Sequence, residues 1–137
     1  MEEGAELHLT APELLPWDPA GLLSGSRLDA RLDELPGWYV KTSPHPASIC
    51  RDWITPDFDS AARLAATLAG LAAAAQHHPD ISFGWGYFHV RWRTHDLGGI
   101  HENDILLALA TERLLAASGH GQPAVLELPV DRGPGHR

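Results

Sequence analysis

The chain has 137 residues and a formal net charge of −8, and 44% of its residues are hydrophobic, a composition that suits one domain with a packed core. The acidic excess argues against a direct nucleic-acid partner, because phosphate binding needs clustered Lys and Arg. The single cysteine, Cys50, cannot form an internal disulfide, so we expect a reducing compartment and a cytoplasmic protein.

The N-terminal segment, residues 1–22, is predicted to be an irregular extension. Its start is acidic and lacks the basic and apolar parts of a secretion signal. No apolar run in the chain reaches the roughly 18 residues of a membrane span, so no membrane partner is expected. Three prolines prevent a long helix in this segment, although Leu14, Leu15 and Trp17 can still dock on the rest of the protein.

A short helix and a β-hairpin are predicted next. The helix has a suitable N-cap at Ser24 or Ser26, leucines at helical spacing, and a Pro-Gly pair that ends it. Residues 38–54 contain two apolar, β-prone runs separated by a proline-rich turn, which is typical of a hairpin.

A longer, alanine-rich helix should follow. Residues 55–57, Thr-Pro-Asp, are typical of a helix start, with the threonine hydroxyl as the cap and the proline at the first helical position. The helix should run to about Ala75 and pack close to a sheet. Pro79 prevents its continuation and favours an extended residue before it, so His77 and His78 should lie at the helix exit.

Two more strands and a last helix complete the predicted domain. Residues 81–85 and 87–94 are predicted strands, and alternation in the second indicates burial on one face only. A double glycine then leads to a helix over residues 102–117, whose broad apolar surface can cover the sheet and also meet a second subunit. Residues 118–137 are expected to be a tail, with a loose strand at residues 124–128.

Three histidines and a carboxylate gather around the helix exit and the later turn: His77, His78, His95 and Asp104. An imidazole titrates near neutral pH, so it can take and return a proton under cellular conditions. The histidines can supply a base, an acid and a hydrogen bond to a polar ligand, while Asp104 can orient one of them or bind a donor-rich ring. Each is most simply an exposed loop residue when taken singly, but the group favours a catalytic site.

Other chemistries fit this pattern less well. Histidine and aspartate suit zinc or iron, but adjacent histidines in an extended segment point apart, and there is no His-x-His or His-x-x-x-His pattern, so no metal site is predicted. The absence of a Gly-x-Ser-x-Gly elbow argues against Ser-His-Asp hydrolysis. Cys50 is expected to be a small buried strand residue and not a nucleophile.

The remaining histidines and Trp38 have simpler expected roles. His45 should lie in a turn, and His89 on the solvated face of its strand. His101 and His120 are expected at the surface. Trp38 follows a Pro-Gly pair at a strand start, a place equally typical of a core residue and of a pocket wall.

Several motifs occur in order along residues 23–117: Leu35-Pro36-Gly37-Trp38, Ile49-Cys50-Arg51, His77-His78-Pro79-Asp80-Ile81, Thr94-His95, Gly98-Gly99-Ile100, and Asp104 before an apolar helix. This ordered set, at these spacings, resembles the pterin-4a-carbinolamine dehydratase family. The resemblance implies an α+β fold with two layers, in which a four-stranded antiparallel sheet has helices packed on one face. That fold is a β-β-α-β-β-α core preceded by a short helix, in agreement with the elements predicted above.

The resemblance also implies a reaction. Members of this family remove water from a 4a-hydroxytetrahydropterin and form the quinonoid dihydropterin, which recycles the pterin cofactor of aromatic amino-acid hydroxylation. A proton leaves a ring nitrogen and the departing hydroxyl gains one, and histidines can do both without a metal or another cofactor. Family members are dimers or tetramers, so a homodimer or homotetramer that binds a pterin substrate is expected.

By resemblance, His77, His78 and His95 are the catalytic histidines and also contact the pterin. The other residues that the resemblance places at the substrate site are Gln76, Pro79, Thr94, Asp96, Asp104 and Trp38. The chain departs from the family at Ala73, where a glutamate is usual four residues before the first histidine. A carboxylate that can orient His77 from the same helix face is therefore missing.

A non-catalytic role on the same scaffold is the second hypothesis. The family includes members that stabilise the dimer of a transcription factor, and relatives that assist the assembly of another protein. Ala73 and the additional residues at both ends favour such a binding or assembly role. The retained histidines and Asp104 count against it, because a pure adaptor has no need of all four.

Overall fold

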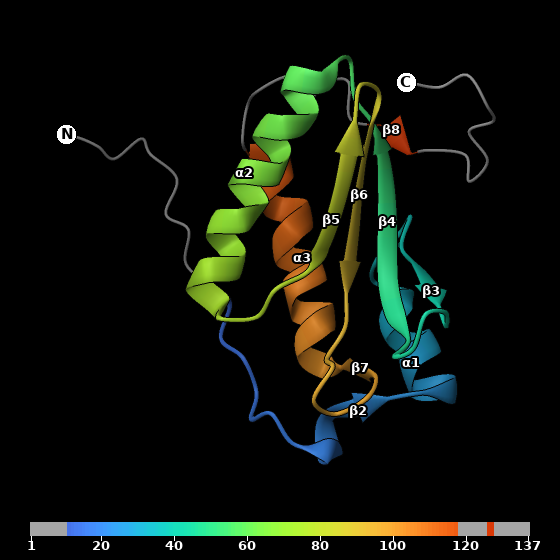
Figure 1. Cartoon of the computed structure of the whole chain (residues 1–137). Coiled ribbons are helices and arrows are strands. Elements are labelled where there is room, and N and C mark those ends of the chain that lie inside the picture. The colour runs from blue at the N-terminus through green and yellow to red at the C-terminus, as the bar shows by residue number, and fades with distance from the viewer. Residues whose placement is uncertain (1–10, 118–125, 128–137) are drawn as a thin grey trace.

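The computed structural model describes residues 11–117 and 126–127 as an α+β domain (Figure 1). In chain order its elements are η1 (Pro19–Gly21), β2 (Leu22–Leu23), α1 (Gly25–Leu32), β3 (Tyr39–Lys41), β4 (Ser48–Ile54), α2 (Phe58–Ala75), β5 (Asp80–Gly84), β6 (Tyr87–Trp92), β7 (Ile100–His101), α3 (Glu102–Ala117) and β8 (Leu126–Glu127). The short helix, the hairpin, the two long helices and the second pair of strands all lie where the sequence predicted them.

Four antiparallel strands form the main sheet in the order β3-β4-β6-β5. α2 and α3 lie against the same face of this sheet (Figure 1), which confirms the predicted fold. β8 pairs with the end of β4 and lies within the loose strand predicted at residues 124–128. The rest of the predicted tail is outside the described residues.

A two-stranded sheet that the sequence did not predict ties the N-terminal segment to the domain. Leu22 pairs with His101 and Leu23 with Ile100. A Cβ on Gly21 would lie 2.2 Å from the His101 ring, so glycine allows the backbone to pass close to this imidazole. The segment expected to be irregular therefore contains a 3-10 turn and a strand that are part of the folded structure.

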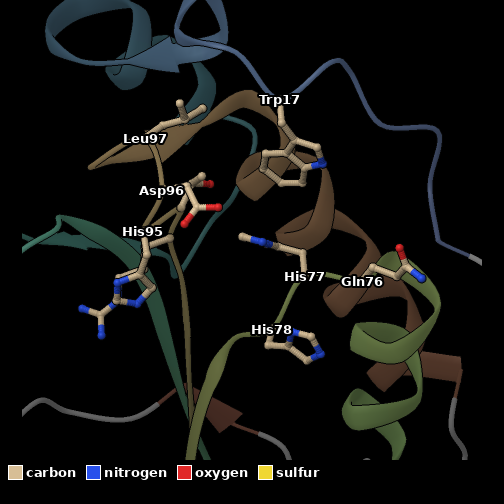
Figure 2. A pocket seen from close by; sticks show the side chains of 9 residues that line it. Trp17, Gln76, His77, His78, His95, Asp96 and Leu97 are labelled. Atoms are coloured by element: carbon tan, nitrogen blue, oxygen red, sulfur yellow. The ribbon is translucent and has the colours of Figure 1, made fainter.

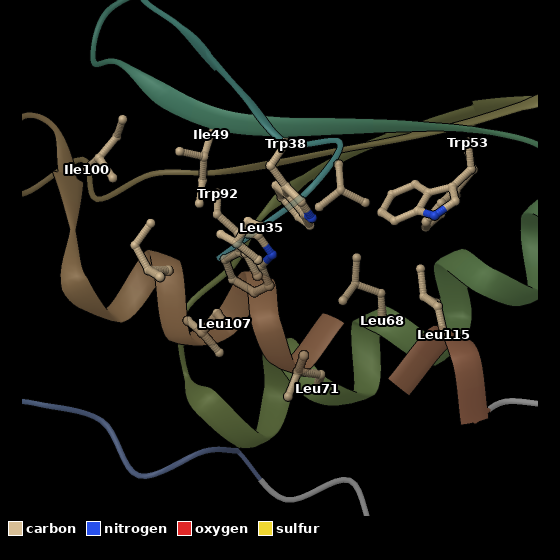
Figure 3. Packing of buried hydrophobic residues seen from close by; sticks show 14 of the residues in the cluster. Leu35, Trp38, Ile49, Trp53, Leu68, Leu71, Trp92, Ile100, Leu107 and Leu115 are labelled. Carbon is tan, nitrogen blue, oxygen red and sulfur yellow. The ribbon is translucent and has the colours of Figure 1, made fainter. Parts of the chain in front are cut away.

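The hydrophobic core lies between the inner face of the sheet and the two long helices (Figure 3). On β6 the three residues predicted to point inward, Phe88, Val90 and Trp92, are fully buried. Leu68 of α2 and Leu107 of α3 belong to the same cluster. Burial of each such side chain contributes about 1.5–3 kcal/mol, so this packing holds the exit of α2 and the end of β6 in a fixed relation.

α2 begins two residues later than its predicted cap implies. The N-cap is Asp57, whose carboxylate accepts a 2.8 Å hydrogen bond from the backbone N–H of Ser60. Thr55 remains with the sheet, because its backbone N–H donates to the carbonyl of Gly86 at 3.1 Å. Neither α2 nor another helix in the described part of the chain is long and apolar enough to cross a membrane.

The opposite face of the sheet carries a polar network that corrects the prediction for His89. Asp52 accepts hydrogen bonds of 2.5 Å from the Tyr39 hydroxyl and from Nδ1 of His89. The His89 side chain is only 18% exposed and is not simply solvated. Strand register explains this, because Asp52 lies directly opposite His89. Cys50, next to this network on β4, is fully buried as predicted.

This network predicts that stability falls as the pH rises. Burial lowers the pKa of His89, but the hydrogen bond and charge of Asp52 outweigh burial and raise the pKa to about 9, above the ordinary value of 6.5. Such a group stabilises the folded state fully below about pH 6.5, and this contribution is lost as the pH rises through about 9. We expect a loss of about 3 kcal/mol in the free energy of unfolding across this window.

Denaturant unfolding at several pH values between 6 and 9.5 (about the range in which His89 titrates) measures this loss. His89→Gln is the matched variant, because it keeps a polar side chain beside Asp52 but cannot gain the charge. The difference in unfolding free energy between the native protein and this variant should shrink with rising pH. A difference that is independent of pH would contradict the charged pair.

Candidate active site

The exit of α2 carries the first two histidines of the site. Gln76 adopts a left-handed conformation with φ of 54°, which ends the helix and turns the chain toward β5. A residue other than glycine pays about 1–2 kcal/mol for this conformation, and such strain often occurs at functional sites. The turn leaves His77 partly buried and His78 exposed, both outside the helix as predicted.

The turn after β6 carries the third histidine. The backbone N–H of Thr94 donates to the carbonyl of Gly99 at 2.8 Å, and that of Gly98 donates back to Thr94 at 3.0 Å. Gly98 has a φ of 78°, a conformation that strongly favours glycine. This tight turn projects His95 and Asp96 outward, and both are exposed.

The two turns and the N-terminal segment surround an open cavity of about 440 Å³. The residues that line it are Trp17, Gln76, His77, His78, Arg93, Thr94, His95, Asp96 and Leu97. In Figure 2, His77 lies between Trp17 and His78, and His95 and Asp96 face it from the other side. Six of the nine residues predicted for the substrate site therefore meet around one cavity.

Asp104 lies beneath the cavity and is fully buried. Its Oδ1 is 2.9 Å from Nε2 of His77, and its Oδ2 accepts hydrogen bonds from the Thr94 hydroxyl at 2.8 Å and the His101 backbone N–H at 2.9 Å. Because a carboxylate only accepts, His77 donates through Nε2. Asp104 thus holds the His77 ring in one orientation.

His77 is also held between two indole rings. Its ring centroid lies 4.6 Å from that of Trp17, and 5.7 Å from that of Trp92 in a stacked arrangement. With the bond to Asp104, these contacts fix the orientation of His77 and leave its side chain 16% exposed. His78 and His95 are the more exposed histidines of the cavity.

Arg93 links His95 to two other parts of the chain. Its Nε donates to Nε2 of His95 at 3.2 Å, while its Nη2 pairs with Asp80 at 2.9 Å and its Nη1 donates to the carbonyl of Pro44 at 3.3 Å. A guanidinium cannot accept a hydrogen bond, so Nε2 of His95 is the acceptor in this contact.

Three residues of the predicted site do not line the cavity: Asp104, which lies beneath it, Pro79 and Trp38. Trp38 is in the core, where its Nε1 donates to Glu112 at 2.8 Å and its ring meets Trp53 edge-on at 6.1 Å. Of the two roles that the sequence left open for Trp38, the structure shows the core role. Pro79 acts on the backbone, between the helix exit and β5.

His101, expected at the surface, is fully buried. It precedes α3, and its Nδ1 accepts the backbone N–H of Asn103 at 3.0 Å, which satisfies one of the free donors at the helix start. Its Nε2 then donates to the carbonyl of Asp18 at 3.1 Å. His45 is exposed in its turn as predicted, and His120 lies outside the described residues.

Within residues 11–117 and 126–127, no three His, Cys, Asp or Glu side chains are grouped so that they could hold a metal ion. The nearest approach to such a group at the cavity is the pair of His77 and Asp104. That the chemistry needs no metal or other cofactor stays a prediction.

The sequence missed three residues of the cavity: Trp17, Arg93 and Leu97. The apolar residues Leu14, Leu15 and Trp17 did indicate that this segment packs on the domain, because a solvated extension is usually polar. Arg93 precedes Thr94 and His95, but strand alternation assigned it only to a polar face. Leu97 lies in the turn and carries no chemical signal of its own.

The fold and the cavity define a class of protein: an α+β domain whose histidine-lined ligand site has a buried carboxylate that orients one imidazole. The sequence pattern of the family described as pterin 4 alpha carbinolamine dehydratase matches residues 21–114. The chain belongs to this family, whose named members are hydro-lyases.

Several relatives are similar over most of their length. A protein of Paracoccus denitrificans named pterin-4-alpha-carbinolamine dehydratase is 46% identical over 102 residues, which cover 74% of this chain and 91% of the relative. A protein of the same name from Azoarcus is 38% identical over 99 residues, 72% of this chain and 82% of the relative. The crystal structure of a transcriptional coactivator/pterin dehydratase from Brucella melitensis has 28% identity and a TM-score of 0.60, and covers 68% of this chain and 97% of its own.

Proposed function

We propose that this protein catalyses the loss of water from a 4a-hydroxytetrahydropterin, with the quinonoid dihydropterin as product, and thereby serves the recycling of a pterin cofactor. The observation that carries this proposal is the cavity itself. It joins His77, His78 and His95 over the buried carboxylate of Asp104, in a chain that belongs to the dehydratase family.

The proposed chemistry is a pair of proton transfers. One imidazole takes the proton from the ring nitrogen of the substrate, another imidazole protonates the 4a-hydroxyl, and that group leaves as water while a C=N bond forms. His78 and His95 suit these transfers because both are exposed at the cavity. His77, held by Asp104 and two indoles, suits a fixed hydrogen bond that orients the pterin.

A dehydration assay tests this function directly. A 4a-hydroxytetrahydropterin generated in situ dehydrates spontaneously, and the protein is expected to raise this rate in proportion to its concentration. The measurement is the rate of formation of the quinonoid product with and without protein. If folded protein leaves the spontaneous rate unchanged, the cavity is not a dehydratase site.

A binding role on the same scaffold is the second candidate. It is favoured by the solved relative from Brucella melitensis, whose name joins a transcriptional coactivator and a pterin dehydratase. The same assay separates the two candidates, because a pure binding protein would fold and recognise its partner without accelerating dehydration.

Self-association and a cytoplasmic location stay predictions. The last helix was expected to offer a broad apolar surface to a second subunit, but Leu106, Leu109 and Leu114 of α3 are only partly exposed. In the described chain, the large apolar side chains that are clearly exposed are Leu15, Trp17, Phe58 and Trp85, none of which belongs to α3. The homodimer or homotetramer is therefore inferred from the family and not from this surface.

A further inference from the structure

Trp17 reaches the cavity from outside the part of the chain that matches the family. The family pattern begins at residue 21, yet the indole of Trp17 lines the cavity and covers His77 (Figure 2). Trp17 is still 42% exposed, so part of its indole is open to a ligand in the cavity. An exposed indole at the mouth of a polar cavity is well placed to meet a flat ligand.

The backbone on both sides of Trp17 is fastened to the start of α3. The N–H of Leu15 donates to Oδ1 of Asn103 at 2.7 Å, and Nδ2 of Asn103 donates to the carbonyl of Leu15 at 2.9 Å. On the other side, the carbonyl of Asp18 accepts from His101 at 3.1 Å. Asn103 and His101 are fully buried, so this clamp rests on rigid structure.

The residues that hold the N-terminal segment lie next to the carboxylate that orients His77. His101 and Asn103, which hold the N-terminal segment, flank the helix start next to Asp104, which holds His77. The backbone beside Trp17 and the ring of His77 are therefore both held by residues 101–104, which fixes their relative position. A segment held by these hydrogen bonds is part of the folded wall of the cavity.

We propose that Trp17 is a substrate-contacting residue that determines the affinity of the site for the pterin ring. This inference rests on the proposed function, since it names a wall of the same cavity. An indole offers a flat, polarisable face to the conjugated amide and guanidine-like atoms of the pyrimidinone ring, and burial of this part of the substrate against the indole adds affinity. Trp17 takes no part in proton transfer, so it should affect binding more than chemistry.

The test compares Trp17→Ala and Trp17→Phe with the native protein in steady-state kinetics. Trp17→Ala should raise KM about 3- to 10-fold while kcat changes less than about twofold, and Trp17→Phe should restore most of the affinity. Trp85→Ala is the matched control, because Trp85 is 57% exposed in the β5–β6 turn and does not line the cavity. This control should leave both constants unchanged.

A double variant tests the clamp. Asn103→Ala removes both hydrogen bonds to Leu15, and it should raise KM when Trp17 is present but add nothing in the Trp17→Ala background. If Asn103→Ala raises KM further in the Trp17→Ala background, Asn103 does not act through Trp17, and this part of the proposal is overturned. Circular dichroism and denaturant unfolding show that each variant compared is folded.

Calorimetric titration with oxidised biopterin, which cannot be dehydrated, distinguishes failure of the proposed function from failure of the proposed role of Trp17. If the native protein neither accelerates dehydration nor binds biopterin, the proposed function falls and the role of Trp17 falls with it. If the native protein does both, and Trp17→Ala has the same KM and the same Kd, only the role of Trp17 is overturned. A loss of kcat at constant KM would also overturn it, because Trp17 would then act through the orientation of His77.

Discussion

Replacing His78 or His95 by alanine is expected to slow enzymatic dehydration by about 10²- to 10⁴-fold, the usual contribution of a general acid or base. The two imidazoles reach the cavity from different segments, the exit of α2 and the turn after β6. Both side chains are exposed, so their removal leaves no hole in the core. The free energy of unfolding should therefore change by less than about 0.5 kcal/mol.

The measurement is kcat/KM for each variant after subtraction of the spontaneous rate, together with denaturant unfolding. His45→Gln is the control, because His45 is exposed in the turn between β3 and β4 and does not line the cavity. It should retain the native kcat/KM. Full turnover in both alanine variants would place the proton transfers elsewhere, even if the native protein proves to be a dehydratase.

The double variant adds information about how the two histidines work. If they act as acid and base in one step, each single loss removes most of the advantage, and the double variant should be little worse than the poorer single variant. If they contribute independently to the same transition state, the two losses should multiply. The first outcome is expected, because removal of the ring proton and departure of the hydroxyl complete the same elimination.

The long, patterned elements of the fold could be predicted from sequence. α2 and β6 each carry enough residues for helical or alternating periodicity to be recognised, and the core side chains of β6 lie where alternation placed them. β2 and β7 have two residues each, too few for any period to be visible. Their pairing depends on a partner far along the chain, which local patterns do not encode.

The candidate site could likewise be predicted only in part. The histidines and Thr94 could be located because they form motifs and follow a predicted helix and strand. The environments of His89 and His101 could not, because each depends on a partner from another element, Asp52 and Asp18 respectively. Alternation shows which face of a strand a residue occupies, but strand register decides which acid it meets.

The clamp on the N-terminal segment is the clearest case. Leu15 and Asn103 are 88 positions apart, and neither the leucine backbone nor a helix-start asparagine carries a signal that they bind each other. An asparagine at a helix start is ordinarily explained by capping alone. Here the Asn103 side chain instead binds the backbone of Leu15, and the His101 side chain caps α3.

Two substitutions of Asp104 should separate its effect on stability from its effect on catalysis. Asp104→Ala leaves two buried donors without a partner, the His101 backbone N–H and the Thr94 hydroxyl. Each such group costs about 1–3 kcal/mol, so we expect a loss of about 3 kcal/mol in the free energy of unfolding. Activity should also fall, because His77 loses the carboxylate that orients it.

Asp104→Asn should keep the fold and still lose activity. The amide oxygen can accept from Thr94 and from the His101 backbone N–H, as Oδ2 does in the native protein. The amide nitrogen then faces Nε2 of His77 and can only donate, so the ring hydrogen must move from Nε2 to Nδ1. The wrong tautomer should lower kcat about 10- to 100-fold, with stability within about 1 kcal/mol of the native protein.

NMR of the His77 ring nitrogens provides the measurement that a purely structural role would not affect. In the native protein Nε2 should carry the hydrogen, and in Asp104→Asn the hydrogen should be on Nδ1. If Asp104→Asn shows the altered tautomer with full activity, His77 contributes only shape to the cavity, and the catalytic work belongs to His78 and His95. If both tautomer and activity change, orientation of His77 by Asp104 contributes to catalysis.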